Sequence, residues 1–447
     1  MIFSERLKSS LVGDSDARFV YLNNFEVERS WANGEPKLPG AGISFAGTTV
    51  NRMEEMGALL AEQGDFVVLK SPLDPDYRAH LEELEAIAGE VLAADDSDPA
   101  RTITEDALRS PELLMRLRGL ADGQTYLMPM GISPAEEELA KETGLPLAGP
   151  SAAVCKHVNG KIFSRELVDR TGLRAVPGGV ARTVGDLASV LREQLAGGGR
   201  AVVKESLGVS GRGMVLVEDE RAAARLLRLI ERRGADQRAD LVVESWVESA
   251  QDLNYQFLVS RTGEVRFETV KAAVLRGGVH QGHRFPVPLS DAVDRELRHA
   301  AQVIGTALHE EGYFGMVGVD AMLAPGDVLY PCLEINARFN MSTYQSRIAE
   351  RFIPADNHAI AATIHLRLSR RHGFPEVADA LGELLFDGGP RPGVLINNFA
   401  TLNAAAPAQG GEFHGRLYAV CIADDAEAAL RLRAEAERRL QRMAEEA

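Results

Sequence analysis

The sequence predicts a parallel α/β domain at the N-terminus, followed by two α+β units. Up to residue 150, short apolar segments alternate with amphipathic ones, a pattern typical of parallel sheets with crossover helices. After residue 150 the chain carries paired strand-like segments and Gly-rich turns, which favour antiparallel sheets. The length of 447 residues agrees with about three domains.

The composition is that of a folded, acidic protein. Hydrophobic residues make up 45% of the chain and charged residues 26%, which permits large buried cores. The net charge of −16 argues against a nucleic-acid coat or a basic membrane-surface protein, but leaves room for a local basic pocket. The basic residues are 8 Lys and 41 Arg, so a Lys at a special position stands out.

The cysteines and the hydropathy indicate a cytoplasmic protein. Cys155, Cys332 and Cys421 are far apart and form neither a disulfide framework nor a zinc motif. The N-terminus lacks the apolar core of a secretory signal, and no apolar stretch is long enough to span a bilayer. We therefore expect neither nucleic acid nor a membrane as a partner.

The N-terminal region is expected to contain three buried strands, Arg18 to Asn23, Asp65 to Lys70 and Thr125 to Met130, and one helix, Asn51 to Gln63. Gly40, Gly42 and Gly47 faintly imitate a dinucleotide-binding loop. They follow Pro39 and a polar segment instead of a strand, so a surface loop is the better interpretation.

The rest of the chain is expected to form two α+β units. Helices are predicted at 161–170, 184–195 and 220–233, and strands at 201–204, 214–217 and 241–244. A hairpin follows, 254–259 with 264–271, and then a long helix capped by Ser290 or Asp291. The last elements are strands at 316–322 and 328–335, a helix near Asp356 to Arg371, and a β-β-α tail at 394–400, 415–423 and from Ala426.

A Lys precedes a Gly-rich turn in the middle region. Lys204 ends one strand, Gly208, Gly211 and Gly213 follow, and the next strand begins at Met214. Glycines let backbone N–H groups approach phosphate oxygens, and a Lys at a strand end can bridge two phosphates. The segment is not a Walker A loop, because no Gly-Lys-Ser/Thr opens a helix. A hairpin with a solvated Lys is the alternative.

Asp320, Glu334 and Asn336 form a second pattern. Glu334 and Asn336 are two residues apart in a predicted strand and point to one face, and Asp320 lies on the preceding strand. Two carboxylates and an amide oxygen suit Mg²⁺ with nucleotide phosphates, whereas the pattern holds no Cys or His cluster for zinc. A solvated sheet face is the alternative.

A third pattern is an apolar strand that ends at Glu244 and leads into Trp246, Val247 and Asp252. Such a hinge can offer backbone groups to an adenine edge and a carboxylate to ribose hydroxyls. Most Glu residues in such a position only end a strand, which is the alternative here.

The order of these three patterns resembles the ATP-grasp superfamily. The resemblance covers Pro150 to Arg347 and rests on Lys161, Lys204, Glu244, Asp320, Glu334 and Asn336. The N-terminal region resembles a pre-ATP-grasp domain, and the chain is most similar to peptide ligases of the pheganomycin-pathway type, which add an unusual amino acid to the N-terminus of a peptide. The implied domains are 1–149 (pre-ATP-grasp), 150–247 (the N-terminal ATP-grasp subdomain, which includes a lid), 248–390 (the metal-binding C-terminal subdomain) and 391–447 (its β-β-α extension).

The resemblance implies how ATP and Mg²⁺ are bound. Lys161 and Lys204 would hold phosphates, with Ser210, Gly211 and Gly213 closing over them. Glu244, Trp246 and Val247 would hold adenine, Asp252 the ribose, and Asp320, Glu334 and Asn336 two Mg²⁺ ions. Lys156 competes with Lys161, which is preferred because Ile162 to Leu167 continues like the family helix.

Two positions depart from the family pattern. Glu205 follows Lys204 where many members have Pro. Gly318 stands where several dipeptide-forming members have a phosphate-binding Arg, so Arg276 or Arg338 is expected to supply that charge.

The segment from Lys271 to Phe285 is unusually basic. Lys271 is in phase with Val265 and Phe267, on the apolar face of the strand, where a lone Lys more often snorkels along apolar surface than takes part in catalysis. His280 and His283 are candidates for a general base, with incidental loop histidines as the alternative. The expected catalytic residues are thus Arg276, Arg338, Lys271 and His283.

The implied chemistry is carboxylate activation by ATP, followed by attack of an amine on the acyl phosphate. We expect an ATP-dependent carboxylate–amine ligase that joins a small carboxylate to an amine or peptide, in natural-product or antibiotic biosynthesis. A phosphotransferase on the same scaffold and a non-catalytic nucleotide-sensing module are the alternatives, and a biotin-dependent carboxylase fits less well. Homodimers are common in the family.

Overall fold

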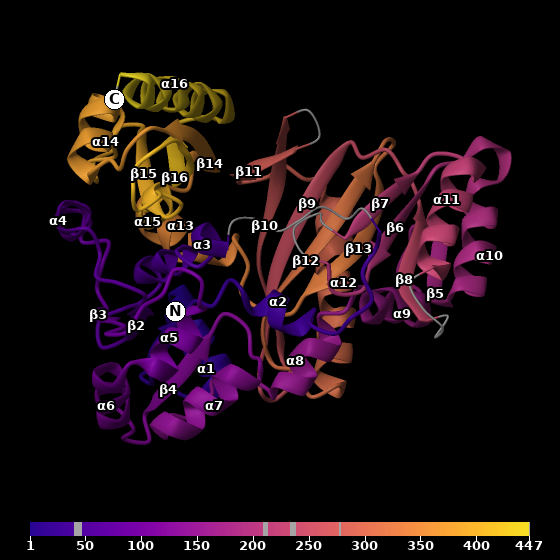
Figure 1. Ribbon diagram of the computed structural model, residues 1–447, viewed down its shortest axis with the longest axis horizontal. Helices are drawn as coiled ribbons and strands as arrows, with labels where there is room; N and C mark the ends of the chain where they lie inside the picture. The colour runs from indigo at the N-terminus through magenta and orange to yellow at the C-terminus, as the bar shows by residue number, and fades with distance from the viewer. Residues whose placement is uncertain (40–46, 209–212, 233–237, 277–278, 447) are drawn as a thin grey trace.

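Three β-sheets organise the protein (Figure 1). The computed structural model describes residues 1–39, 47–208, 213–232, 238–276 and 279–446, apart from the side chains of 275–281. A parallel sheet near the N-terminus and a small antiparallel sheet flank a large eight-stranded sheet. None of the helices in these ranges is both long and apolar enough to cross a membrane.

The N-terminal sheet is parallel, with the strand order β3-β2-β1-β4. Its strands are β1 (Arg18–Leu22), β2 (Phe66–Leu69), β3 (Glu90–Ala93) and β4 (Thr125–Pro129). The helices of this region are α1 (Phe3–Val12), α2 (Val27–Trp31), α4 (Pro75–Glu83), α5 (Ile103–Arg109), α6 (Pro111–Gly119) and α7 (Pro134–Thr143). The three predicted strands are confirmed. The sequence pattern did not indicate β3, because only Leu92 of its four residues is buried.

The prediction of one helix from Asn51 to Gln63 is wrong if it is taken as an α-helix. The chain forms a short helix, α3 (Gly47–Val50), and then a 3-10 helix, η1 (Met53–Leu59). Every residue of η1 is buried, and the Glu55 carboxylate accepts the backbone N–H of Phe399 at 2.6 Å. Packing on all sides stabilises the tighter helix, an effect of tertiary structure that apolar periodicity does not reveal.

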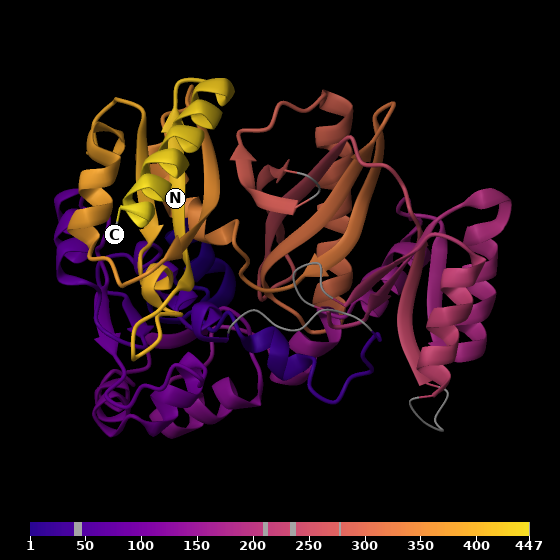
Figure 2. The same cartoon turned by 45° about the horizontal axis from the view of Figure 1, so that its top comes forward.

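The small sheet and its helices form a unit that we call the lid, residues 178–245. Its antiparallel strands, in the order β5-β8-β6-β7, are β5 (Gly178–Thr183), β6 (Ala201–Glu205), β7 (Met214–Val217) and β8 (Arg238–Ser245). Helices α10 (Val184–Leu195) and α11 (Glu220–Glu231) cover its outer face (Figure 2). The side chains of Thr183 and Asp219 cap these helices, as is usual for such residues. The expected lid elements are confirmed.

The large sheet has the strand order β13-β12-β9-β10-β11-β14-β16-β15. Its strands are β9 (Gln251–Val259), β10 (Val265–Arg276), β11 (Val279–Phe285), β12 (Gly315–Ala324), β13 (Val328–Asn336), β14 (His358–Leu368), β15 (Gly393–Asn398) and β16 (Phe413–Ala423). The helices of this part of the chain are α8 (Ala152–Val158), α9 (Lys161–Thr171), α12 (Asp291–Glu310), α13 (Ser346–Phe352), α14 (Phe374–Leu381), α15 (Ala400–Asn403) and α16 (Ala426–Glu445). The predicted hairpin, long helix and β-β-α tail are confirmed.

The helix expected near Asp356 to Arg371 is wrong: this segment is strand β14. All eleven residues of β14 pair with β16, and residues Ala359 to Ala362 also pair with β11 on the other side. The Ala-rich sequence favours a helix locally, but two neighbouring strands outweigh that preference. The helix that the sequence pattern did not indicate, α14, follows directly after it.

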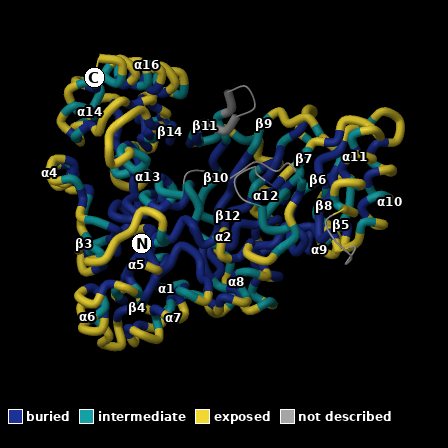
Figure 3. The backbone as a smooth tube through the Cα atoms, in the orientation of Figure 1, coloured by how far each residue is buried: buried dark blue, intermediate teal, exposed yellow. Residues whose placement is uncertain are grey.

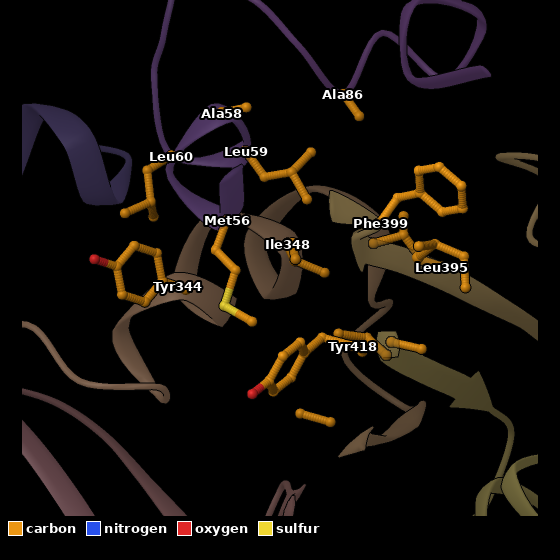
Figure 4. Packing of buried hydrophobic residues seen from close by; sticks show 14 of the residues in the cluster. Met56, Ala58, Leu59, Leu60, Ala86, Tyr344, Ile348, Leu395, Phe399 and Tyr418 are labelled. Carbon is orange, nitrogen blue, oxygen red and sulfur yellow. The ribbon is translucent and has the colours of Figure 1, made fainter. Parts of the chain in front are cut away.

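The N-terminal and C-terminal parts of the chain share one hydrophobic core. Met56 and Leu59 of η1 pack with Ile348 of α13 and Leu395 of β15 (Figure 4). The lid has a separate core, and Leu38 from the segment after α2 is part of it. Figure 3 shows buried backbone along the large sheet and exposed residues along α16.

Candidate active site

Two neighbouring strands bring the three candidate metal ligands together. In the pairing of β12 with β13, Asp320 lies opposite Glu334 and Gly318 lies opposite Asn336, so all these positions share one face. The amide of Asn336 donates to Asp320 Oδ2 at 3.1 Å. The amide of Asn254 on β9 donates to Asp320 Oδ1 at 2.8 Å. The cluster is held by its own hydrogen bonds.

The electrostatics of the cluster suit a divalent cation. Burial and the nearby Glu334 carboxylate raise the pKa of Asp320 to about 6. Two carboxylates and the amide oxygen of Asn336 are hard oxygen donors of the kind that Mg²⁺ prefers. Within the described ranges no group of three or more His, Cys, Asp or Glu side chains is placed to hold a metal ion.

Lys161 connects this cluster to the lid. Its ammonium lies 2.5 Å from Glu334 Oε1 and donates to the carbonyl of Gly208 at 2.8 Å, just before the Gly-rich turn. Lys161 is the first residue of α9 and is buried. The competing Lys156 pairs with Glu35 at 2.7 Å instead. The geometry therefore favours Lys161 as the first phosphate-binding Lys.

Lys204 and Glu244 lie on the face of the lid sheet opposite its helices. The Lys204 ammonium lies 2.6 Å from Glu244 Oε2, and the guanidinium of Arg165 on α9 lies 3.5 Å from Glu244 Oε1. Strand pairing places Met214 beside Lys204 on the same face, and Met214 is 39% exposed. An exposed apolar side chain beside this Lys could pack against an aromatic ring, and it is a feature that sequence reasoning missed.

The other residues predicted to contact the nucleotide lie between the end of β8 and the start of β9 or in the Gly-rich turn. Trp246 is 46% exposed, with the guanidinium of Arg200 over its ring at 5.7 Å, and Val247 is half-buried. Asp252, on β9, accepts a hydrogen bond from Ser249 Oγ at 2.6 Å. Ser210 and Gly211 lie outside the described residues.

Glu205, which replaces the expected Pro, ties the lid to the N-terminal region. Its Oε1 accepts the backbone N–H of Leu38 at 2.5 Å, and its own N–H donates to the carbonyl of Gly213 at 2.7 Å. Gly213 has a φ of +72°, and a Cβ there would lie 2.5 Å from Glu205 Oε2. A Pro at position 205 would lack both the N–H and the carboxylate.

The space in front of Gly318 is filled. A Cβ at position 318 would lie 1.9 Å from Nδ2 of Asn340. Asn340 is fixed by the amide of Gln256 and by Thr343, whose N–H and hydroxyl both donate to Asn340 Oδ1. The expected Arg of dipeptide-forming members therefore has no room here.

Arg338 is held from two sides. Its NH1 donates to Asn336 Oδ1 at 2.7 Å, and its guanidinium forms an ion pair with Glu28 of α2. Trp31 on the same helix also reaches this region. One pocket is lined by Glu28, Trp31, Asn159, Leu207, Gly208, Glu334, Asn336 and Arg338. Sequence reasoning missed Glu28, because no local pattern links residues 310 positions apart.

Lys271 lies on the polar face of the sheet, and its predicted phase is wrong. A β-bulge between Phe267 and Thr269 shifts the alternation by one residue, so Lys271 pairs with Asn254 instead of facing the core with Phe267. Asn254 in turn pairs with Asp320, which places Lys271 in the same row as the metal cluster.

The ammonium of Lys271 is buried and does not snorkel to solvent. The residue is 2% exposed, and Nζ donates to the carbonyl of Ser342 at 2.7 Å and to Gln345 Oε1 at 2.8 Å. Burial lowers the pKa of Lys271 well below its ordinary value. His283 on β11 pairs with Ala273, two residues along β10, and so lies on this face too. The side chains of Arg276 and His280 lie outside the described part of the chain.

Comparisons with known proteins agree with this architecture. Residues 53–145 match the pre-ATP-grasp domain family. The chain is 28% identical over 233 residues to a [butirosin acyl-carrier protein]–L-glutamate ligase from Niallia circulans, covering 51% of this chain and 55% of the relative. It is 26% identical over 199 residues to the carbamoyl phosphate synthase large chain of Xanthomonas campestris, covering 44% of this chain and 18% of the relative. The chain thus spans about half or less of the length of these relatives.

Solved structures extend the likeness to nearly the whole chain. N5-carboxyaminoimidazole synthetase from Staphylococcus aureus, complexed with ADP, has a TM-score of 0.53 at 14% identity and covers 95% of this chain and 98% of its own. Biotin carboxylase from Campylobacter jejuni has a TM-score of 0.52 at 15% identity and covers 87% of this chain and 88% of its own. The chain therefore combines a pre-ATP-grasp domain with an ATP-grasp fold.

Proposed function

We propose that the protein is an ATP-dependent carboxylate–amine ligase. The observation that carries the proposal is the contact of Lys161 with both Glu334 of the carboxylate cluster and the carbonyl of Gly208 beside the lid turn. A triphosphate bound between lid and sheet needs cations from both sides, and Lys204 faces it from the lid. The proposed units are 1–149, 150–247, 248–390 and 391–447.

The reaction proceeds in two steps. An oxygen of the substrate carboxylate attacks the γ-phosphorus of ATP, the bond to the β–γ bridging oxygen breaks, and ADP leaves. The amine then attacks the acyl carbon, phosphate leaves with the electrons of the carbon–oxygen bond, and the ammonium proton is lost to a base. Asp320, Glu334 and Asn336 would hold Mg²⁺, which would supply charge neutralisation at the phosphates.

The residues of the chain have distinct roles in this scheme. Lys161 and Lys204 orient the phosphates as point charges, and Asn254 fixes the Asp320 carboxylate. Arg338 stabilises the transferring phosphoryl group, and the phosphate displaces Glu28 from its guanidinium. Lys271 and His283 lie on one face of the paired strands β10 and β11, and His283 is the candidate to accept the proton of the attacking amine. Arg276, at the end of β10, is the other candidate cation for the phosphoryl group.

The proposed substrates are an amino-acid-like carboxylate and the amino group of an amino acid or peptide. We place the reaction in a natural-product or antibiotic pathway of the cytoplasm and propose that the enzyme is a homodimer. The glutamate ligase relative supports the amino-acid part of this choice, because its name records L-glutamate as one of the two components that it joins. The pocket beside Asn336, with an acidic Glu28 and an apolar Trp31, suits a substrate that carries an ammonium group.

The test is product analysis. The enzyme, ATP and Mg²⁺ are incubated with pools of amino acids and peptides, and nucleotides and masses are measured. ADP and phosphate should form only when acid and amine are both present, with a product of their summed mass less water. Release of AMP and pyrophosphate would refute the acyl-phosphate mechanism. ADP release with a stable phosphorylated product and no need for an amine would identify a phosphotransferase.

A further inference from the structure

A polar cavity of about 310 Å³ lies away from the candidate active site, where the N-terminal region meets the C-terminal β-β-α elements. Thr48 of α3 and Ala400 and Asn403 of α15 line the cavity from these two parts of the chain. None of the residues that line this cavity also lines the pocket around Asn336. The cavity is therefore separate from the region assigned to the nucleotide phosphates and the metal.

The cavity lies at the edge of the N-terminal parallel sheet that is formed by the carboxyl ends of its strands. Lys70 and Ser71 come directly after β2, and Ser97 follows β3. In open α/β sheets, ligands bind in the crevice outside the carboxyl ends of the strands. Here α15 and Arg371 from the C-terminal part close that crevice.

Two guanidinium groups, from different parts of the chain, line the cavity. Arg52 uses Nε to hold Glu54 at 3.2 Å, and its terminal nitrogens have no partner among the described residues. The guanidinium of Arg371 forms neither a hydrogen bond nor an ion pair with any residue that the structure describes. Both groups are therefore available to a ligand.

The acidic groups that line the cavity are engaged with the backbone. Glu55 accepts the N–H groups of Phe399 and its neighbour, and burial raises its pKa to about 7. Asp74 caps α4 by accepting the N–H groups of Asp76 and Tyr77. Neither carboxylate forms a hydrogen bond or an ion pair with Arg52 or Arg371 in the described part of the chain, although the charge of Arg52 opposes the effect of burial on the pKa of Glu55. The two guanidinium groups are thus cationic donors that remain for a ligand.

We propose that this cavity binds the anionic group of a small molecule, a carboxylate or a phosphate, between Arg52 and Arg371. The forked guanidinium matches the paired oxygens of both anions, and clamping from two directions adds specificity. The hydroxyls of Thr48, Ser71 and Ser97 are further donors in the same lining. The anion belongs either to the free C-terminus of an acceptor peptide or to a separate phosphorylated ligand.

Binding of inorganic phosphate tests the site directly. Phosphate is titrated by calorimetry into the full chain with saturating ADP and Mg²⁺, which occupy the nucleotide region. We expect Arg371→Gln and Arg52→Gln to weaken phosphate binding by about tenfold or more. Arg371→Gln distinguishes a loss of binding from a loss of folding, because the guanidinium of Arg371 has no partner among the described residues whose loss would destabilise the protein. The matched control is Arg370→Gln: Arg370 is exposed, pairs with Glu376 and does not line the cavity.

A second pair of probes distinguishes the source of the anion. A tripeptide with a free C-terminal carboxylate and its C-terminal amide are titrated in the same way. Binding of the free acid that is lost in Arg371→Gln, with no binding of the amide, identifies a peptide carboxylate. Binding of phosphate alone identifies a phosphorylated ligand. Equal binding of every probe to the native chain and Arg371→Gln, or no binding to the native chain, overturns the proposal. These are binding measurements without turnover, so they do not depend on the ligase reaction.

Discussion

Replacing the buried Lys271 by Met should change how the stability of the protein depends on pH. The substitution keeps the length of the side chain but leaves the Ser342 carbonyl and Gln345 Oε1 without their donor. Leaving a buried acceptor unsatisfied costs about 1–3 kcal/mol. The substitution also removes an ammonium whose burial is unfavourable, so the two effects oppose each other at neutral pH.

The sign of the pH dependence follows from the lowered pKa. Between the folded pKa and the ordinary value of 10.5, the unfolded chain holds a proton on Lys271 that the folded chain lacks. The free energy of unfolding of the native protein therefore rises with pH in this window, by up to about 1.4 kcal/mol per pH unit for this group. Lys271→Met lacks this contribution, so it should be most stable relative to the native protein at low pH and least stable near pH 10.5.

The assay is urea unfolding of both proteins at several values of pH, read as the difference in unfolding free energy. Other titrating groups cancel, because both proteins carry them. Lys141→Met, on the exposed surface of α7, is the matched control and should show a constant difference. A constant difference for Lys271→Met as well would refute the reasoning, since it would mean that the buried ammonium keeps its ordinary pKa.

Three further substitutions test other parts of the structure. Lys161→Met should weaken ATP binding by about tenfold or more, whereas Lys156→Met should leave it within about twofold, as measured by calorimetry; equal effects would remove the distinction between the two lysines. Gly318→Ala should destabilise the protein by about 1–3 kcal/mol because its Cβ meets Asn340, and a second change, Asn340→Gly, should restore part of the loss in thermal unfolding. Leu38→Ala should lower the stability of the lid by about 2–5 kcal/mol, seen as faster hydrogen exchange in β6 and α10 but not in the large sheet.

The sequence was sufficient to predict an element when the apolar face and the caps of that element are visible in its own residues. The lid helices show this: α10 and α11 carry caps, one apolar face and clear ends, and both were predicted. The prediction failed for β14, where pairing with β11 and β16 overrides the helix preference of an Ala-rich segment. Strand pairing is a property of distant segments, so periodicity within one segment does not contain it.

The bulge before Lys271 shows the same limit at a single residue. Two-residue alternation assigned Lys271 to the core face with Phe267, and one extra residue in β10 reverses that assignment. No residue in the segment 267–269 marks the bulge, since it contains neither Gly nor Asn. From the sequence, Lys271 was predicted as a candidate residue but was placed on the wrong face of the sheet.

Three candidate cations were predicted from the sequence, but the ion pairs that they form were not. Lys161, Lys204 and Arg338 stand out by type and position, and each is paired with a carboxylate: Glu334, Glu244 and Glu28, respectively. These pairs join positions 40 to 310 residues apart, which only the fold brings together. A buried cation without a partner is unfavourable. Each carboxylate therefore stabilises, in the absence of ATP, a cation that is proposed to bind a phosphate. In the proposed function, a phosphate that binds Lys161 would free Glu334 Oε1 for Mg²⁺, so one exchange of partners would prepare the proposed phosphate site and the proposed metal site together.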